Sequence, residues 1–152
     1  MTTTKATSHD AELILKLYDL RREPVMREAR AYFNTLPPTE ESFLNVLAKP
    51  GSKENSYVRQ VVGYWEMAAS LVVHGALNAA LAFDTLQEMY FVYARVKPFL
   101  PMLREKTNSP DFLMNMEKVA EGTEESRARV VRVQARIQAM VAAAAKSASG
   151  KP

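Results

Sequence analysis

The stretch GYWEMAASLVVHGALNAALAF (residues 63–83) decides the fold. It carries no formal charge from Met67 to Phe83, but Glu66 opens it and His74 interrupts it. Seventeen uncharged residues are at the short limit for a helix that spans a membrane. Gly75 suits the left-handed backbone conformation that ends a helix, so the run is predicted to turn back on itself. We therefore expect a buried helical hairpin and no transmembrane span.

Apolar residues on both sides of Gly75 recur at the three- and four-residue steps of an amphipathic helix. No stretch shows the alternation of a half-buried strand. The sequence predicts an all-α protein, a single compact helical bundle of five to seven helices. Its centre is expected to be an antiparallel helical hairpin made of residues 54–74 and 84–106.

Capping residues and prolines give the expected helix boundaries. Ser8, Asp84 and Thr123 are predicted N-caps, as is Ser109, which precedes a proline. Pro24 removes a backbone donor and is expected to break the first helical segment. The expected organisation is a disordered N-terminal tail (1–8), one helical domain (9–146) and a frayed C-terminal tail (147–152).

Charge is distributed unevenly along the chain. After Ser126 there are six basic residues and no acidic one, whereas residues 1–126 carry fourteen basic and seventeen acidic residues. An anionic partner would therefore meet the last segment. The start MTTTKATSHD lacks the apolar core of a secretory signal, so a cytoplasmic location is expected.

A loose motif runs from Tyr64 to Arg104. It consists of an aromatic pair followed by Glu66, a small apolar run, Gly75, a short connection and a long helix that ends in Lys97-Pro98. Together with the segment LYDLRREPVMREAR (17–30), it resembles a bacterial and phage family known as domain of unknown function family 4760. The resemblance implies an all-helical fold and carries no activity, substrate or catalytic residue.

Glu66 and His74 are the polar groups that the apolar stretch must accommodate. On one helix they differ by roughly 80° in direction and about 12 Å in rise, so they cannot share a ligand. Glu66 is expected to pair with Arg59 on its own helix, or with Arg95 or Lys97 from the neighbouring helix. The alternative is a carboxylate that contacts a ligand. His74 is expected to interact with the last carbonyl groups of its helix.

The chain has no constellation that predicts catalysis. It has no cysteine, and neither histidine follows a glutamate by three residues, as the dimetal helical bundles require. Glycine-rich phosphate loops and nucleophile elbows are also absent from the sequence. We predict a protein that is not an enzyme, with no catalytic residue, cofactor or metal.

Two segments carry more apolar residues than one helix face can bury. The segment around residues 89–93 is apolar in nearly every direction, so it is either central in the bundle or covered by another subunit. The final helix carries a short coiled-coil-like seam with steps of three and four. The residues of these two possible interfaces are Tyr90, Phe91, Tyr93, Val130, Val133, Ile137 and Met140.

Arg129, Arg132 and Arg136 form a stripe beside this seam and are the candidate anion-binding residues. A basic amphipathic helix can face solvent, bind a protein partner, or lie on nucleic acid or anionic lipid. No aromatic residue follows Phe112, which disfavours base stacking and weakens anchoring at a membrane surface.

Three hypotheses of function follow. The first is a non-enzymatic interaction or scaffold protein that forms a homo-oligomer or binds a protein partner. The second is a peripheral binder of nucleic acid or anionic lipid through the basic final helix. The third is a binder of an apolar small ligand, or an enzyme without a recognisable motif, built around Glu66, Tyr90 and Arg95.

Overall fold

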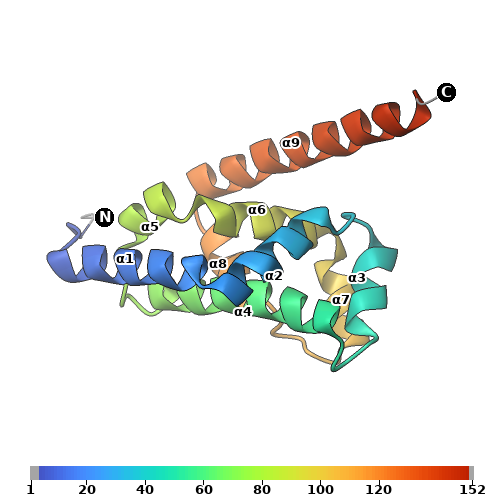
Figure 1. Cartoon of the computed structure of the whole chain (residues 1–152). Helices are drawn as coiled ribbons and strands as arrows, with labels where there is room; N and C mark the ends of the chain where they lie inside the picture. The colour runs from blue at the N-terminus through green and yellow to red at the C-terminus, as the bar shows by residue number, and fades with distance from the viewer. Residues whose placement is uncertain (1–3, 151–152) are drawn as a thin grey trace.

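The computed structural model describes residues 4–150. Within this range the chain forms nine α-helices, one 3-10 helix and no strand (Figure 1). The predicted all-α class is confirmed, but five to seven helices are too few, because the segment from 79 to 106 is divided into four. The elements are α1 (Ser8–Arg22), α2 (Pro24–Thr35), α3 (Glu40–Leu47), α4 (Lys53–Val73), α5 (Ala79–Thr85), α6 (Gln87–Val96), η1 (Lys97–Phe99), α7 (Leu100–Lys106), α8 (Met114–Glu121) and α9 (Glu124–Ser149).

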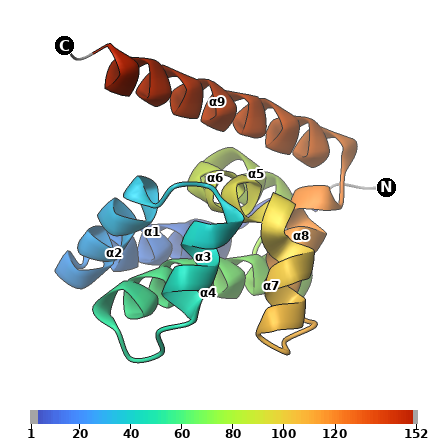
Figure 2. The same ribbon diagram turned by 90° about the vertical axis from the view of Figure 1, so that its right-hand side faces the viewer.

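Helices α1 to α8 form the body of the molecule, and α9 lies across it (Figure 2). Helix α4 packs most extensively against α2 and α8, whereas its contact with α6 is slight. The main neighbour of α6 is α9. The predicted central pairing of residues 54–74 with 84–106 is therefore wrong. Seven of the ten residues of α6 are buried, so this helix needs cover on several sides, and α9 supplies one of them.

The turn at Gly75 lies where the sequence predicted it. Helix α4 ends at Val73, and His74 is its C-cap residue. Gly75 has a φ of +74°, which residues with a side chain rarely adopt. The uncharged stretch therefore folds back instead of continuing as one rod.

The first two helices begin close to their predicted positions. Thr7, and not Ser8, is the N-cap of α1, in a capping box with Asp10. Pro24 breaks the segment as expected and occupies the first turn of α2. Within the predicted N-terminal tail, the carbonyl group of Thr4 accepts a hydrogen bond of 2.6 Å from the Asn78 side chain.

Two other predicted caps are wrong. Asn78, and not Asp84, caps the helix after the turn, since its side chain accepts a hydrogen bond from the amide of Leu81 at 2.9 Å. Asp84 lies inside α5. Ser109 starts no α-helix either, because a turn follows it and α8 begins only after Leu113, whose φ of 56° is left-handed.

Thr123 caps α9 as predicted, and this helix continues to Ser149. The predicted end of the helical domain at 146 is therefore three residues short. Residues 1–3 and 151–152 of the two predicted tails lie outside the described residues. Figures 1 and 2 both show α9 diverging from the body towards its C-terminal end.

Candidate interaction surface

Glu66 is the N-terminal cap of α8, a helix that lies about fifty residues further along the chain. Its Oε1 accepts hydrogen bonds from the backbone N–H and the side-chain amide of Asn115 at 2.9 and 2.8 Å, and its Oε2 accepts one from the N–H of Met116 at 2.9 Å. A carboxylate is well suited to this position, because the first N–H groups of a helix lack partners and form its positive end. The predicted ion pair of Glu66 with Arg59, Arg95 or Lys97 is therefore wrong.

Arg95 caps the C-terminal end of a helix, whereas Glu66 caps an N-terminal end. It is buried, and its Nη2 donates to the carbonyl groups of Leu36 and Phe33 at the C-terminal end of α2. Its guanidinium also lies 5.6 Å from the centroid of the Phe33 ring and 5.4 Å from that of Phe91. Burial lowers the pKa of Arg95. This arginine is a structural group that closes α2.

The other two predicted polar residues lie at the surface. Arg59 and His74 are both exposed. The imidazole of His74 forms no hydrogen bond within residues 4–150, and the backbone N–H of His74 is the group that donates to the carbonyl of Ser70 near the end of α4. Glu66, Tyr90 and Arg95 each have separate partners, so the structure does not bring these three residues together in one site.

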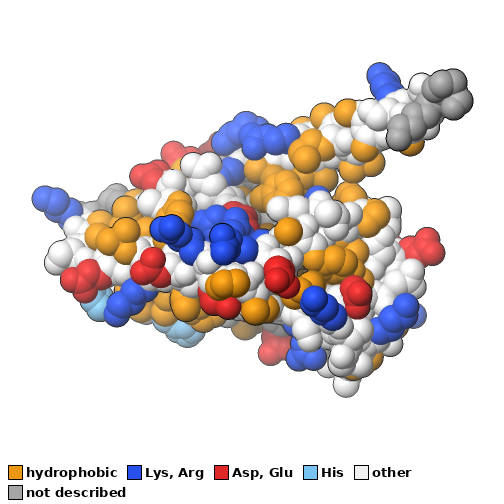
Figure 3. All heavy atoms as spheres, viewed as in Figure 1, with side chains coloured by type: hydrophobic (Ala, Val, Ile, Leu, Met, Phe, Trp, Pro, Cys, Tyr) orange, Lys and Arg blue, Asp and Glu red, His pale blue; other side chains and the backbone are white. Residues whose placement is uncertain are grey.

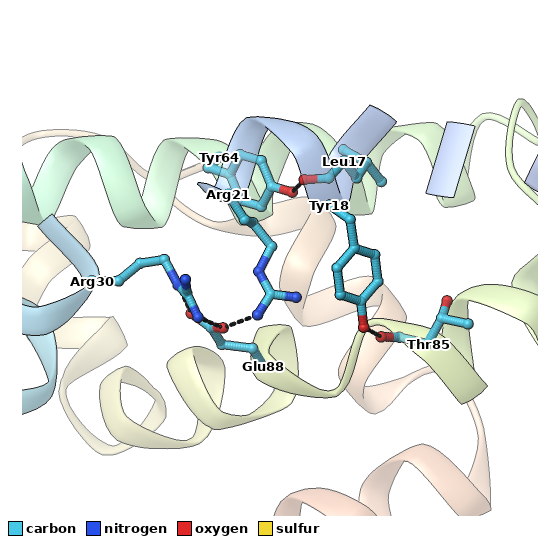
Figure 4. A network of polar contacts seen from close by, with 7 residues as sticks. All are labelled: Leu17, Tyr18, Arg21, Arg30, Tyr64, Thr85 and Glu88. Atoms are coloured by element: carbon cyan, nitrogen blue, oxygen red, sulfur yellow. Dashed lines mark hydrogen bonds and ion pairs between the residues drawn. The ribbon is translucent and has the colours of Figure 1, made fainter. Parts of the chain in front are cut away.

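A polar network joins α1, α2, α4 and α6 (Figure 4). Glu88 accepts a hydrogen bond from Arg21 at 2.5 Å and two from Arg30 at 2.6 and 2.7 Å. This pairing raises the pKa of Arg30. Nearby, the hydroxyl of Tyr64 donates to the carbonyl of Leu17 at 2.5 Å, and burial raises the pKa of Tyr64 to about 12.

Sequence reasoning missed this network. Glu88 lies 67 residues from Arg21 and 58 from Arg30, and nothing in one sequence indicates that three helices bring them together. All three side chains are at least partly buried, with 15–26% of their surface exposed. The network holds the helices in register, and each of its three charged side chains is paired within it.

The aromatic segment is part of the core. Tyr90 and Tyr93 are each 1% exposed, and their hydroxyls lie 3.4 Å from Ser126 and 3.1 Å from Glu121. Phe91 is half-buried beneath Arg95. Of the two alternatives for this segment, the structure places it centrally, where Tyr90 and Tyr93 are unavailable to a partner at the surface.

The seam of α9 has two different environments. Val130, Val133 and Ile137 are buried against the body, whereas Met140 is 56% exposed and Val141 46% exposed. Figure 3 shows hydrophobic side chains on the underside of the C-terminal half of α9, which faces a gap above the body. Only the C-terminal part of the predicted seam is therefore free to contact a partner.

Two hollows of about 420 and 300 Å³ lie beneath this part of α9. Both are lined by Pro38, Arg95, Ile137 and Val141, and we call the two together the α9 cleft. Its floor comes from the segment after α2 and from the end of α6, and its lining is mainly apolar. Pro38 was not predicted as a lining residue, because it lies about a hundred residues before Val141 in the chain.

The arginine stripe is divided in the same way. Arg129 is partly buried, with its Cζ 3.4 Å from the centroid of the Phe83 ring and its Nη1 donating to the carbonyl group of Phe83. Arg132 and Arg136 are exposed. Neither of these two has a salt-bridge partner within the described residues.

Across residues 4–150, no group of three His, Asp or Glu side chains is arranged to hold a metal ion. Over that range too, no helix combines the length and the hydrophobicity needed to cross a bilayer.

Comparison with known proteins identifies one family. A family model described as a domain of unknown function (DUF4760) matches residues 6–123. No curated protein and no solved structure matches the chain. The match includes both segments that carried the resemblance in the sequence, and it ends at Thr123, so α9 lies outside it. The chain belongs to the DUF4760 family of domains of unknown function.

Proposed function

We propose that this protein is a non-enzymatic interaction module that self-associates through the C-terminal half of α9. The observation that carries the proposal is the continuation of one apolar seam from a buried half to an uncovered half. Ile137 is 6% exposed, and three residues later Met140 is 56% exposed. An exposed apolar face on a soluble helix favours a partner.

The occupant that we propose for the α9 cleft is the same helix of a second copy. The cleft and the helix above it are both apolar, both uncovered and adjacent to each other. In a two-fold dimer, the C-terminal half of each α9 would enter the cleft of the other copy. Such a contact is self-complementary, as the common two-fold dimers require, and it covers all four apolar surfaces at once.

Charge supports the same partner. The segment after Ser126 has six basic residues and no acidic one, whereas residues 1–126 have an excess of three acidic residues. Glu40 and Glu41 are exposed in the first turn of α3, directly after the Pro38 segment that lines the cleft. A second copy would bring its basic helix towards these carboxylates, which favours docking on another copy of the chain.

Sedimentation velocity over a micromolar concentration series tests this proposal. The wild-type protein is expected to show a monomer–dimer equilibrium, and a Met140→Glu/Val141→Glu double variant is expected to remain monomeric. Val131→Glu is the matched control, because Val131 is 62% exposed on the same helix and lines neither hollow. A wild-type protein that is monomeric throughout, or a control variant that dissociates like the double variant, would refute the proposal.

A second candidate function is binding of an anionic polymer or lipid surface. It is favoured by the exposure of Arg132 and Arg136 without salt-bridge partners in the described part of the chain. Two phosphate contacts predict a slope of about −1.8 in a plot of log affinity against log salt. Loss of binding in Arg132→Glu/Arg136→Glu with that slope would support it, and a flat salt response would exclude it.

A further inference from the structure

A hollow larger than the α9 cleft lies at the other end of α9. It has a volume of about 1020 Å³ and runs between the end of α4, α5, α8 and the first turns of α9. We call it the α5–α9 groove. Its size is at the upper end of the range of about 300–1,000 Å³ that is common for ligand sites. None of its lining residues lines the α9 cleft, so the two hollows are separate features.

One wall of the groove is apolar. Val72 and Val73 come from the last turn of α4, Phe83 from α5 and Val119 from α8. Val73 is 37% exposed, and the other three are partly buried. These side chains form an elongated apolar surface that the chain itself leaves open.

A second wall is basic. Arg129, Arg132 and Lys118 line it. Two carboxylates, Asp84 and Glu125, also line the groove, but no salt bridge joins either of them to the three cations within residues 4–150. None of the three cations therefore has a carboxylate partner among the described residues.

The guanidinium of Arg129 is held in a fixed position at the junction of the two walls. It stacks 3.4 Å from the Phe83 ring centroid and 5.0 Å from that of Tyr90, and its Nη1 donates to the Phe83 carbonyl group. One nitrogen thus has an acceptor, and no hydrogen bond from Nε or Nη2 occurs within the described residues. A guanidinium held in this way is well prepared to bind an anion, because little side-chain freedom is lost on binding.

We propose that the α5–α9 groove binds a small amphipathic anion, an alkyl chain that ends in a carboxylate or a phosphate. The charged head would lie against Arg129 and Arg132, and the chain would lie along Val72, Val73 and Val119. The basic wall fits the charged head of such a molecule, and the apolar wall fits its alkyl chain. An inorganic anion would leave the apolar wall uncovered, and a neutral hydrocarbon would leave the cations without a partner.

Isothermal titration calorimetry of the full chain with laurate, kept below its critical micelle concentration, tests the proposal. Saturable binding at one site per chain is expected. Arg132→Gln should weaken it by about tenfold or more, because it removes one of the two guanidinium groups that would hold the charged head. Arg136→Gln is the matched control, because Arg136 belongs to the same stripe but does not line the groove, and it should bind laurate like the wild type.

Three further probes separate the contributions of the two walls. Dodecyl phosphate tests the other head group, and tighter binding than that of laurate would identify a phosphate as the better head group. Dodecanol has the chain without the charge, and inorganic phosphate has the charge without the chain, so both should bind at least about tenfold more weakly. Equal binding of dodecanol or of inorganic phosphate, or no saturable binding of laurate, would refute the proposal. Binding should persist in the Met140→Glu/Val141→Glu variant, so this result does not depend on self-association.

Discussion

The two halves of α9 have similar apolar spacing and opposite environments. From Glu124 to Ile137 the seam packs on α6 and α8, and its apolar residues are buried. From Gln138 to Ser149 the same helix diverges from the body above the α9 cleft. Seam spacing alone therefore does not distinguish a helix that packs in the core from one that stays exposed. The two halves of α9 differ in whether helices of the body lie beneath them.

The division of α9 also relates to the family. The DUF4760 match ends at Thr123, the residue that caps α9. The N-terminal half of this helix therefore attaches it to the matched domain, and the C-terminal half projects from it. We infer that α9 adds an assembly surface to the domain.

The largest expected effect contrasts two positions three residues apart on the seam. Ile137→Ala removes a buried side chain and should lower the free energy of unfolding by about 2–5 kcal/mol. Met140→Ala changes an exposed side chain and should alter it by less than about 0.5 kcal/mol. Urea denaturation of dilute protein, in which the monomer predominates, measures both values. Equal losses would mean that both halves of α9 pack on the body.

An intermediate effect is expected at Glu66, which supports the packed N-terminal half of α9 through α8. Glu66→Ala removes the cap of α8, on which the start of α9 rests, and should cost about 1–3 kcal/mol of unfolding free energy. Glu66→Gln keeps one acceptor and should cost less. The matched control is Glu105→Ala, at an exposed glutamate on α7. A loss at Glu66 no greater than at Glu105 would contradict the capping role.

The smallest effect is a loss of unfolding free energy at alkaline pH, which arises from tyrosines of the body and not from α9. Burial raises the pKa of Tyr64 from 10.0 to about 12, so the unfolded chain loses this proton at a lower pH than the folded chain does. The contribution of Tyr64 to the free energy of unfolding is fully present below pH 10 and is lost as the pH rises towards 12. Tyr64→Phe should flatten the fall in unfolding free energy across this window. Tyr93, whose pKa burial also raises, should leave a residual slope.

Sequence signals predicted the features that depend on neighbouring residues. Gly75 adopts a positive φ because no side chain opposes it, and Pro24 starts a helix because its missing donor has no cost there. Thr123 likewise caps the helix that directly follows it. Each of these effects lies within one turn of the residue that produces it.

The features that the sequence did not predict depend on residues far apart in the chain. Ser109 was expected to start a helix, but the first amide groups of α8 are satisfied by Glu66, which lies on another helix. Glu88 joins Arg21 and Arg30 only after three helices have packed. The exposure of the second half of the α9 seam depends on where the body ends, and spacing along one helix does not contain that information.

Hydrogen exchange of the backbone amides of α9, measured by NMR or mass spectrometry at low and high protein concentration, tests the central claim most directly. Residues 130–137 should be protected at both concentrations, because they pack on the body. Residues 141–149 should exchange rapidly in the dilute monomer and become protected as the dimer forms. Strong protection of residues 141–149 in the dilute monomer, or dimer formation without any gain in their protection, would contradict the account.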